Sequence, residues 1–160
     1  MLDQNRARWD RLLIGHGLAA LARAHRLGGT DGVYVLQADI AACHARAVRA
    51  EDTDWTRIAA LYARLGEVAP SPVIDLNRAV AVSMAEGPAA ALPLVEALAA
   101  GGALAGYHLL PAVRGDLLFR LDRHGEAAAA FREAASLTRN AREQAQLEAR
   151  ADACGHDHNG

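Results

Sequence analysis

Apolar side chains recur at helical spacing along most of the chain, and glycine, proline or a helix-capping residue separates one apolar run from the next. The first run begins near Trp9 and ends at Gly28 and Gly29, which predicts a helix over 6–27. By the same reasoning we expect further helices over residues 33–48, 55–68, 72–85, 89–99, 107–123, 126–138 and 140–151. About eight helices joined by short links are typical of an all-α fold.

Residues that favour helix ends mark several of these boundaries. Thr53 or Asp54 precedes the third expected helix, and either side chain can accept a hydrogen bond from the first backbone N–H groups of that helix. Ser71 followed by Pro72 predicts a cap and a first helical residue, because no N–H donor is needed at that position. Asn140 is the expected cap of the last helix.

The segment over 115–137 reads G-D-L-L-F-R-L-D-R-H-G-E-A-A-A-A-F-R-E-A-A-S-L and resembles the second half of a tetratricopeptide repeat. In that register small and large residues share the helix contact: Gly115, Leu118, Ala127, Phe131 and Ala134. A small residue admits the neighbouring helix, and a large one fills the groove beside it. The pattern predicts stacked antiparallel helical hairpins in a tetratricopeptide-like right-handed superhelix. An irregular helical bundle is the alternative.

Composition agrees with the helical prediction and narrows the environment. Of the 160 residues, 52% are hydrophobic but only 4% are aromatic, since alanine supplies much of the apolar content. We expect one helical domain over 1–153 and a disordered tail over 154–160. The sequence has no membrane-length apolar run and no signal-peptide pattern at its start, which favours a cytoplasmic protein without membrane contact. The net charge of −2 predicts no direct nucleic-acid binding.

Six segments that together cover most of the chain share the pattern of a known family. They are D-Q-N-R-A-R-W-D-R over 3–11, L-Q-A-D-I-A-A-C-H-A over 36–45, E-D-T-D-W-T-R-I-A-A-L-Y over 51–62, P-S-P-V-I-D-L-N-R-A-V-A-V over 70–82, G-Y-H-L-L over 106–110 and H-G-E-A-A-A-A-F-R-E-A over 124–134. These motifs resemble the C-terminal tetratricopeptide-like extension of one group of extracytoplasmic-function (ECF) RNA polymerase sigma factors.

The resemblance implies a regulatory module that contacts the sigma core regions or RNA polymerase and modulates transcription initiation. In the family, the DNA- and polymerase-binding regions lie N-terminal to this extension, and they are absent from the sequence. The chain is therefore expected to be an excised domain or a truncated gene product, and it could not recognise a promoter by itself. The resemblance also implies a link to small proteins of the DGPF (YCII-like) type, which the residues themselves do not show.

Two charged segments are candidates for partner contact. Arg6, Arg8 and Arg11 lie next to the place where a sigma core would join the chain, although an amphipathic helix with solvated arginines would look the same. Asp54 and Trp55 belong to a charged segment that could form a recognition edge together with Glu51, Asp52 and Arg57. The alternative for that segment is helix capping, with acidic side chains near the positive end of the helix dipole.

A third candidate site lies in the middle of the chain. Asn77 and Arg78 occur among apolar residues of one helix, where an amide can bond a peptide backbone and a guanidinium can pair with a carboxylate. Tyr62, Tyr107 and His108 are their expected neighbours in a groove. A buried structural network is the alternative for Asn77 and Arg78. A second hypothesis for function is a small-molecule sensor with a central ligand pocket lined by these side chains.

The sequence predicts no catalytic residue, no cofactor and no metal site, and therefore no enzyme. The histidines share no metal-ligand spacing, and the glycine-rich segment over 28–32 lacks the G-K-[ST] ending of a phosphate-binding loop. Cys154, His156 and His158 are three donors in a tail expected to be disordered, which is weak support for a metal.

Overall fold

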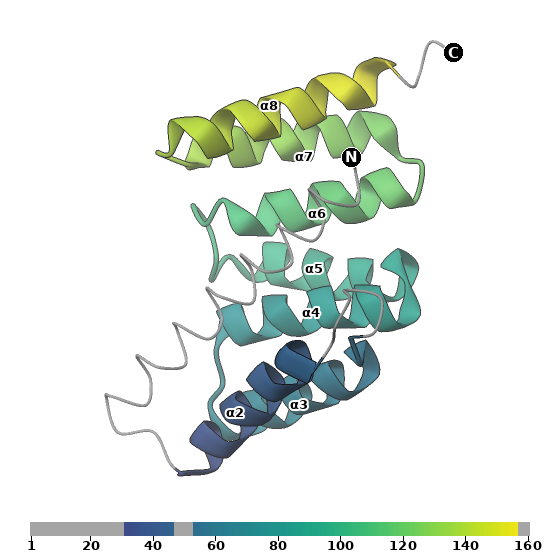
Figure 1. Cartoon of the computed structure of the whole chain (residues 1–160). Coiled ribbons are helices and arrows are strands. Elements are labelled where there is room, and N and C mark those ends of the chain that lie inside the picture. The colour runs from purple at the N-terminus through teal and green to yellow at the C-terminus, as the bar shows by residue number, and fades with distance from the viewer. Residues whose placement is uncertain (1–30, 47–52, 157–160) are drawn as a thin grey trace. The chain divides into compact units, whose positions relative to one another are not determined.

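The computed structural model describes residues 31–46 and 53–156, and these residues form seven α-helices without any β-strand, which confirms the all-α prediction. The helices are α2 (Asp31–Arg46), α3 (Trp55–Val68), α4 (Pro72–Glu86), α5 (Pro88–Gly101), α6 (Leu109–Arg120), α7 (His124–Leu137) and α8 (Ala141–His156) (Figure 1). The chain divides into two compact units, Met1–Ala85 (unit 1) and Glu86–Gly160 (unit 2). None of these helices is both long and apolar enough to cross a bilayer.

The described part of unit 1 packs α2, α3 and α4 around one apolar cluster. The helix α3 places its apolar residues at positions 58, 61, 62 and 65, which is the spacing of a single helix face. The cluster contains residues from all three helices: Leu36, Ile40, Cys43, Ile58, Leu61, Tyr62, Leu65, Ile74 and Ala81. Burying an aliphatic side chain of this size contributes roughly 1.5–3 kcal/mol, so this cluster holds the three helices together.

Unit 2 is a series of helices in which each packs against the next along the chain: α5 on α6, α6 on α7 and α7 on α8. The tetratricopeptide-like positions meet as predicted. Gly115 on α6 is buried, and a Cβ atom built there would lie only 2.8 Å from Cε1 of Phe131 on α7. Leu118, Ala127 and Ala134 are fully buried around this contact. The small residue thus lets α7 approach α6, and the ring fills the space beside it.

Several predicted boundaries are confirmed and one is wrong. The third helix spans the predicted residues, and the side chain of Asp54 caps it by accepting a hydrogen bond from the backbone N–H of Arg57 at 3.1 Å. The last helix, however, continues to His156, so a tail beginning at 154 is wrong for residues 154–156. Leu147, Ala151 and Cys154 are all buried, and their spacing extends the apolar stripe of α8 by one turn.

Two further predictions concern domain organisation. The sequence predicts a single helical domain over 1–153, whereas the chain forms two compact units. The boundary between the units lies between Ala85 and Glu86. The right-handed superhelix therefore stays a prediction. The helix expected over 6–27 and the tail residues 157–160 lie outside the described residues.

Candidate interaction surface

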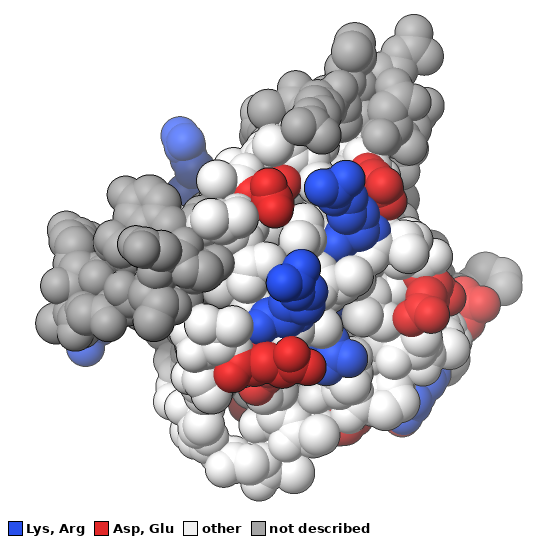
Figure 2. All heavy atoms as spheres, turned by 90° about the horizontal axis from the view of Figure 1, so that it is seen from below, with Lys and Arg blue, Asp and Glu red and all other residues white. Residues whose placement is uncertain are grey.

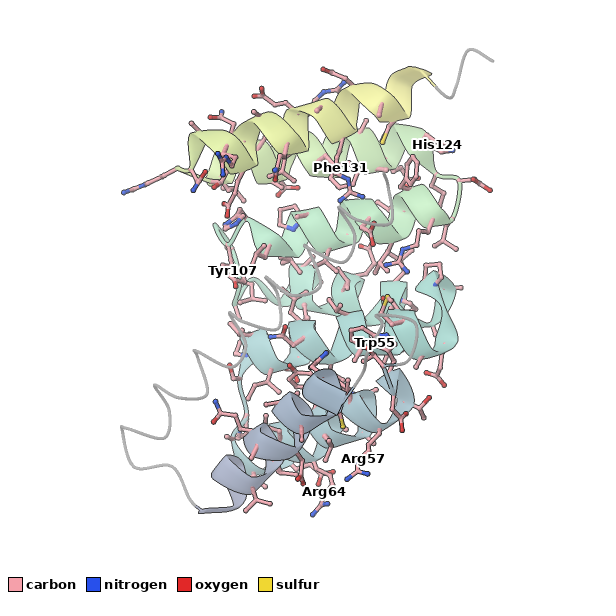
Figure 3. The ribbon with its side chains drawn as sticks, viewed as in Figure 1. Trp55, Arg57, Arg64, Tyr107, His124 and Phe131 are labelled. Atoms are coloured by element: carbon pink, nitrogen blue, oxygen red, sulfur yellow. The ribbon has the colours of Figure 1, made fainter. Side chains whose placement is uncertain are left out.

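Charged side chains in unit 2 pair with one another across helix interfaces. The carboxylate of Asp116 on α6 accepts hydrogen bonds from Arg120, one turn later on the same helix, and from Nη2 of Arg150 on α8 at 2.9 Å. The guanidinium of Arg150 also lies 4.3 Å from the centre of the Phe131 ring. Figure 3 labels Phe131 on α7. One carboxylate and one ring therefore join three helices.

The charge state of Asp116 follows from these contacts. Burial alone would raise the pKa of its carboxyl group, but the guanidiniums of Arg120 and Arg150 and their hydrogen bonds outweigh burial and hold the pKa below its usual value. Asp116 is thus ionised at neutral pH and joins α6 to α8. We call Asp116, Arg120 and Arg150 the clamp residues. A second ion pair, between Nε of Arg114 and Oε1 of Glu96 at 2.8 Å, joins α6 to α5.

A polar cluster joins the beginning of α6 to the beginning of α8. Glu143 accepts a hydrogen bond from Oγ1 of Thr138 at 2.9 Å, and its Oε2 atom lies 3.3 Å from Nε2 of His108. Oγ1 of Thr138 in turn accepts a hydrogen bond from the backbone N–H of Asn140 at 3.2 Å. The rings of Tyr107 and His108 meet edge to face, with centroids 5.9 Å apart. This cluster stabilises the chain segments between the helices of unit 2.

In unit 1, the helix α3 separates an apolar face from an exposed one. Opposite its buried residues runs a line of exposed residues at i, i+3, i+7, i+10 and i+11, which we call the α3 arginine face: Arg57, Ala60, Arg64, Glu67 and Val68. The side chains of Arg57 and Arg64 point away from the unit (Figure 3). No ion pair joins two residues within 31–46 and 53–85, whereas unit 2 holds several.

Each described helix of unit 1 also carries a buried polar atom that has no hydrogen-bond partner among the described residues: Nε2 of His44, the hydroxyl of Tyr62 and Oδ1 of Asn77. Burial lowers the pKa of His44 and raises that of Tyr62, so both side chains are neutral at pH 7. Nδ2 of Asn77 donates to the backbone oxygen of Val73 at 2.9 Å, which satisfies only part of the amide. An unpaired buried polar group costs about 1–3 kcal/mol.

The candidate residues of the sequence fall in several places. Trp55 begins α3, where its ring meets that of His44 edge to face at 5.4 Å. Asn77 is only 3% exposed whereas its neighbour Arg78 is exposed, so the two side chains do not share one surface. Tyr107 and His108 belong to the polar cluster of unit 2, and Asp54 is a helix cap. The candidates Arg6, Arg8 and Arg11 lie outside the described residues.

Arg64 and Glu143 are among the residues of these sites that were absent from the sequence-based candidates. Arg64 lies seven residues after Arg57, so a projection of the helix over 55–68 would have placed both on the side opposite the apolar residues. Glu143 gives no such signal, because its contact with His108 joins residues far apart in sequence.

Comparison with known proteins gives one relative and no family. The chain is 48% identical over 150 residues to a protein of Rhizobium meliloti (strain 1021) whose name describes it as uncharacterized. The match covers 94% of this chain but only 35% of the relative, so the chain spans about a third of the length of that protein. A search of protein families finds no match. No solved structure matches either.

Proposed function

We propose that this chain is a regulatory protein-interaction module of an ECF RNA polymerase sigma factor, which contacts the sigma core regions or RNA polymerase and modulates transcription initiation. The observation that carries the proposal is the packing of Gly115 against Phe131 in the α6–α7 hairpin. That contact uses the small-and-large pairing of tetratricopeptide repeats, whose stacked helices typically expose extended surfaces to protein partners. The resemblance of the six motifs to the sigma-factor extension supports the choice of partner.

The relative from Rhizobium meliloti supports a module that belongs to a longer protein. About two thirds of that relative lies outside the matched segment, so the segment there is joined to other regions of the same chain. A sigma factor with a helical extension has this organisation. The proposal includes no catalytic step and no cofactor, and it keeps a small DGPF-like protein as a further partner.

Transcription in vitro tests this function. We expect the full-length factor and a version that lacks this region to give different yields of transcript from the factor's own promoter. A point variant, Gly115→Leu, should reproduce the effect of the deletion, because its side chain cannot fit beneath Phe131. Gly155→Ala is the matched control, since nothing lies within 4 Å of the added Cβ atom. Equal transcript yields from all four proteins at every salt concentration would contradict the proposal.

A second candidate function is a small-molecule sensor, and the unpaired polar atoms of Tyr62 and Asn77 favour it. A ligand that supplies a donor to Oδ1 of Asn77 would remove part of the cost of burying that atom. Thermal unfolding of the chain in the presence of a metabolite collection tests this function. A rise in melting temperature that Asn77→Leu abolishes would support it, and no rise with any compound would count against it.

A further inference from the structure

The α3 arginine face presents two positive charges at a fixed spacing. Arg57 and Arg64 are seven residues apart on one helix, which places them about 10.5 Å apart along its axis. Neither guanidinium has an ion pair or a hydrogen bond to another described residue. Glu67 is only three residues beyond Arg64 without pairing with it, and the carboxylate of Asp54 caps the helix. Within the part of the chain that the structure describes, the guanidinium donors of both arginines are therefore unused.

The residues around the two arginines favour another helix as their partner. Ala60 is exposed between them, and a small side chain at that position lets a second helix approach closely. Val68 is 50% exposed at the end of the same line and offers an apolar contact. A partner helix with carboxylates seven residues apart would match the spacing of the guanidiniums and could accept two hydrogen bonds from each.

The distribution of charge argues against nucleic acid on this face. Asp54, just before the helix, and Glu67, three residues after Arg64, flank the two arginines, so two carboxylates accompany the two guanidiniums and would repel a continuous phosphate backbone at both ends. Figure 2, which views the molecule from below, shows basic and acidic side chains interspersed with uncharged surface. A partner with a few carboxylates at matched positions fits this arrangement better than a uniform polyanion does.

We infer that the α3 arginine face binds an acidic helical segment of the sigma core regions or of RNA polymerase. This inference rests on the proposed function and adds the surface and the chemistry of the partner. Arg57 and Arg64 pair with carboxylates of that segment, Ala60 lies against its backbone, and Val68 contacts an apolar residue near its end. The clamp residues of unit 2 take no part, because their charges are already paired.

Charge reversal tests the inference. The chain is immobilised, and its affinities for the purified sigma core regions and for core RNA polymerase are measured at two salt concentrations. The double variant Arg57→Glu/Arg64→Glu should bind its partner about tenfold more weakly or worse, because like charges then face each other. The matched control is Arg132→Glu/Arg142→Glu, which makes the same charge change at exposed positions of unit 2 and should bind as the wild type does. Circular dichroism of each variant establishes that it is folded.

The outcomes distinguish failure of the inference about the α3 arginine face from failure of the proposed function. If the wild type binds and the Arg57/Arg64 variant binds equally well, the inference about α3 is overturned while the proposed function stands. If the wild type binds neither the sigma core regions nor polymerase, both are overturned. A photo-crosslinking residue in place of Ala60 should attach to an acidic helix of the partner, and attachment to a segment without carboxylates would overturn the inference. Binding to duplex DNA that depends on Arg57 and Arg64 would also overturn it.

Discussion

The two units differ in the partners that polar side chains have near the interfaces between helices. In unit 2 the carboxylates of Glu96, Asp116 and Glu143 each bond a side chain of another helix or of a segment between helices. In the described part of unit 1, Asn77 and Ser83 donate to backbone oxygens three or four residues earlier, and Asp54 accepts from the backbone N–H of Arg57. Three buried polar atoms there, in His44, Tyr62 and Asn77, lack a partner among the described residues, whereas the buried hydroxyl of Ser83 donates to the backbone oxygen of Val80. Side-chain bonds between different helices therefore help to stabilise unit 2, whereas the described helices of unit 1 are held mainly by their apolar cluster.

This difference indicates which unit a partner protein can bind with the smaller loss of existing contacts. A surface arginine that is already paired must break its bond before it can contact another protein, whereas Arg57 and Arg64 have no such bond to another described residue. The unit with fewer internal polar contacts is also the one expected to open locally at lower free energy. The unpaired arginines and the lower expected cost of local opening therefore both favour unit 1 as the unit that binds a partner. The four predictions below test this contrast between the units, from the largest expected effect to the smallest.

Removal of the Asp116 charge should produce the largest effect. Asp116→Asn leaves Arg120 and Arg150 partly buried without their carboxylate, which we expect to lower the free energy of unfolding by about 3 kcal/mol in urea titrations at pH 7. Arg57→Ala and Arg64→Ala in unit 1 are the comparison and should each change it by less than about 0.5 kcal/mol. Similar losses at all three positions would erase the contrast between the units.

The same variant has a defined pH dependence. Because the folded-state pKa of Asp116 is lowered, its stabilising contribution is complete above the unfolded-state pKa of about 3.9 and is lost as the pH falls through the folded-state value. The gap in stability between wild type and Asp116→Asn should therefore be constant from pH 7 to about pH 5 and shrink at lower pH. A gap that persists unchanged at pH 2 would show that ionisation of this carboxyl is not its source.

Adding one methyl group should have opposite effects in the two units. Alanine in a helix is normally more stable than glycine by about 1 kcal/mol. Gly66→Ala in α3 should show this gain, because its nearest neighbours would lie 3.8 Å away. Gly115→Ala in α6 should instead destabilise by about 1–2 kcal/mol, since the new Cβ atom would lie 2.8 Å from the buried Phe131 ring.

A compensating variant sharpens this second prediction. Phe131→Leu combined with Gly115→Ala should recover part of the lost stability, because the smaller side chain makes room for the methyl group. Strict additivity of the two single changes would mean that the ring and the glycine do not interact. Urea unfolding of the four proteins, with each variant alone and together, measures the coupling.

The sequence predicts the local features of this molecule better than its long-range ones. The small-and-large positions at Gly115 and Phe131 were recognisable because both lie in one repeat-like segment, and the Asp54 cap follows from local chemistry. The clamp between Asp116 and Arg150 was not, since no periodicity relates residues that far apart. The end of α8 was misplaced because its polar composition hid the apolar stripe that Cys154 continues.

Helix caps are a feature in which the two units should not differ. We expect removal of a cap to lower the free energy of unfolding equally in both units. Oδ1 of Asn140 accepts hydrogen bonds from the backbone N–H groups of Arg142 and Glu143, and Asp54 makes the corresponding bond for α3. Asn140→Ala and Asp54→Ala should each cost about 1 kcal/mol in urea unfolding. A cost confined to Asn140→Ala would mean that α3 contributes little to the measured stability of unit 1.

Removal of a single hydroxyl group should change the free energy of unfolding by no more than removal of a cap, and it compares the two units directly. Thr138→Val in unit 2 deletes a group that donates to Glu143 and accepts from the N–H of Asn140, so we expect a loss of about 1 kcal/mol. Tyr62→Phe in unit 1 deletes a buried hydroxyl without a partner among the described residues, so the free energy of unfolding should stay the same or rise slightly. If Tyr62→Phe destabilised the chain as much as Thr138→Val, the hydroxyl of Tyr62 would have to be paired in solution. The contrast between the units would then rest on His44, Asn77 and the arginines of α3.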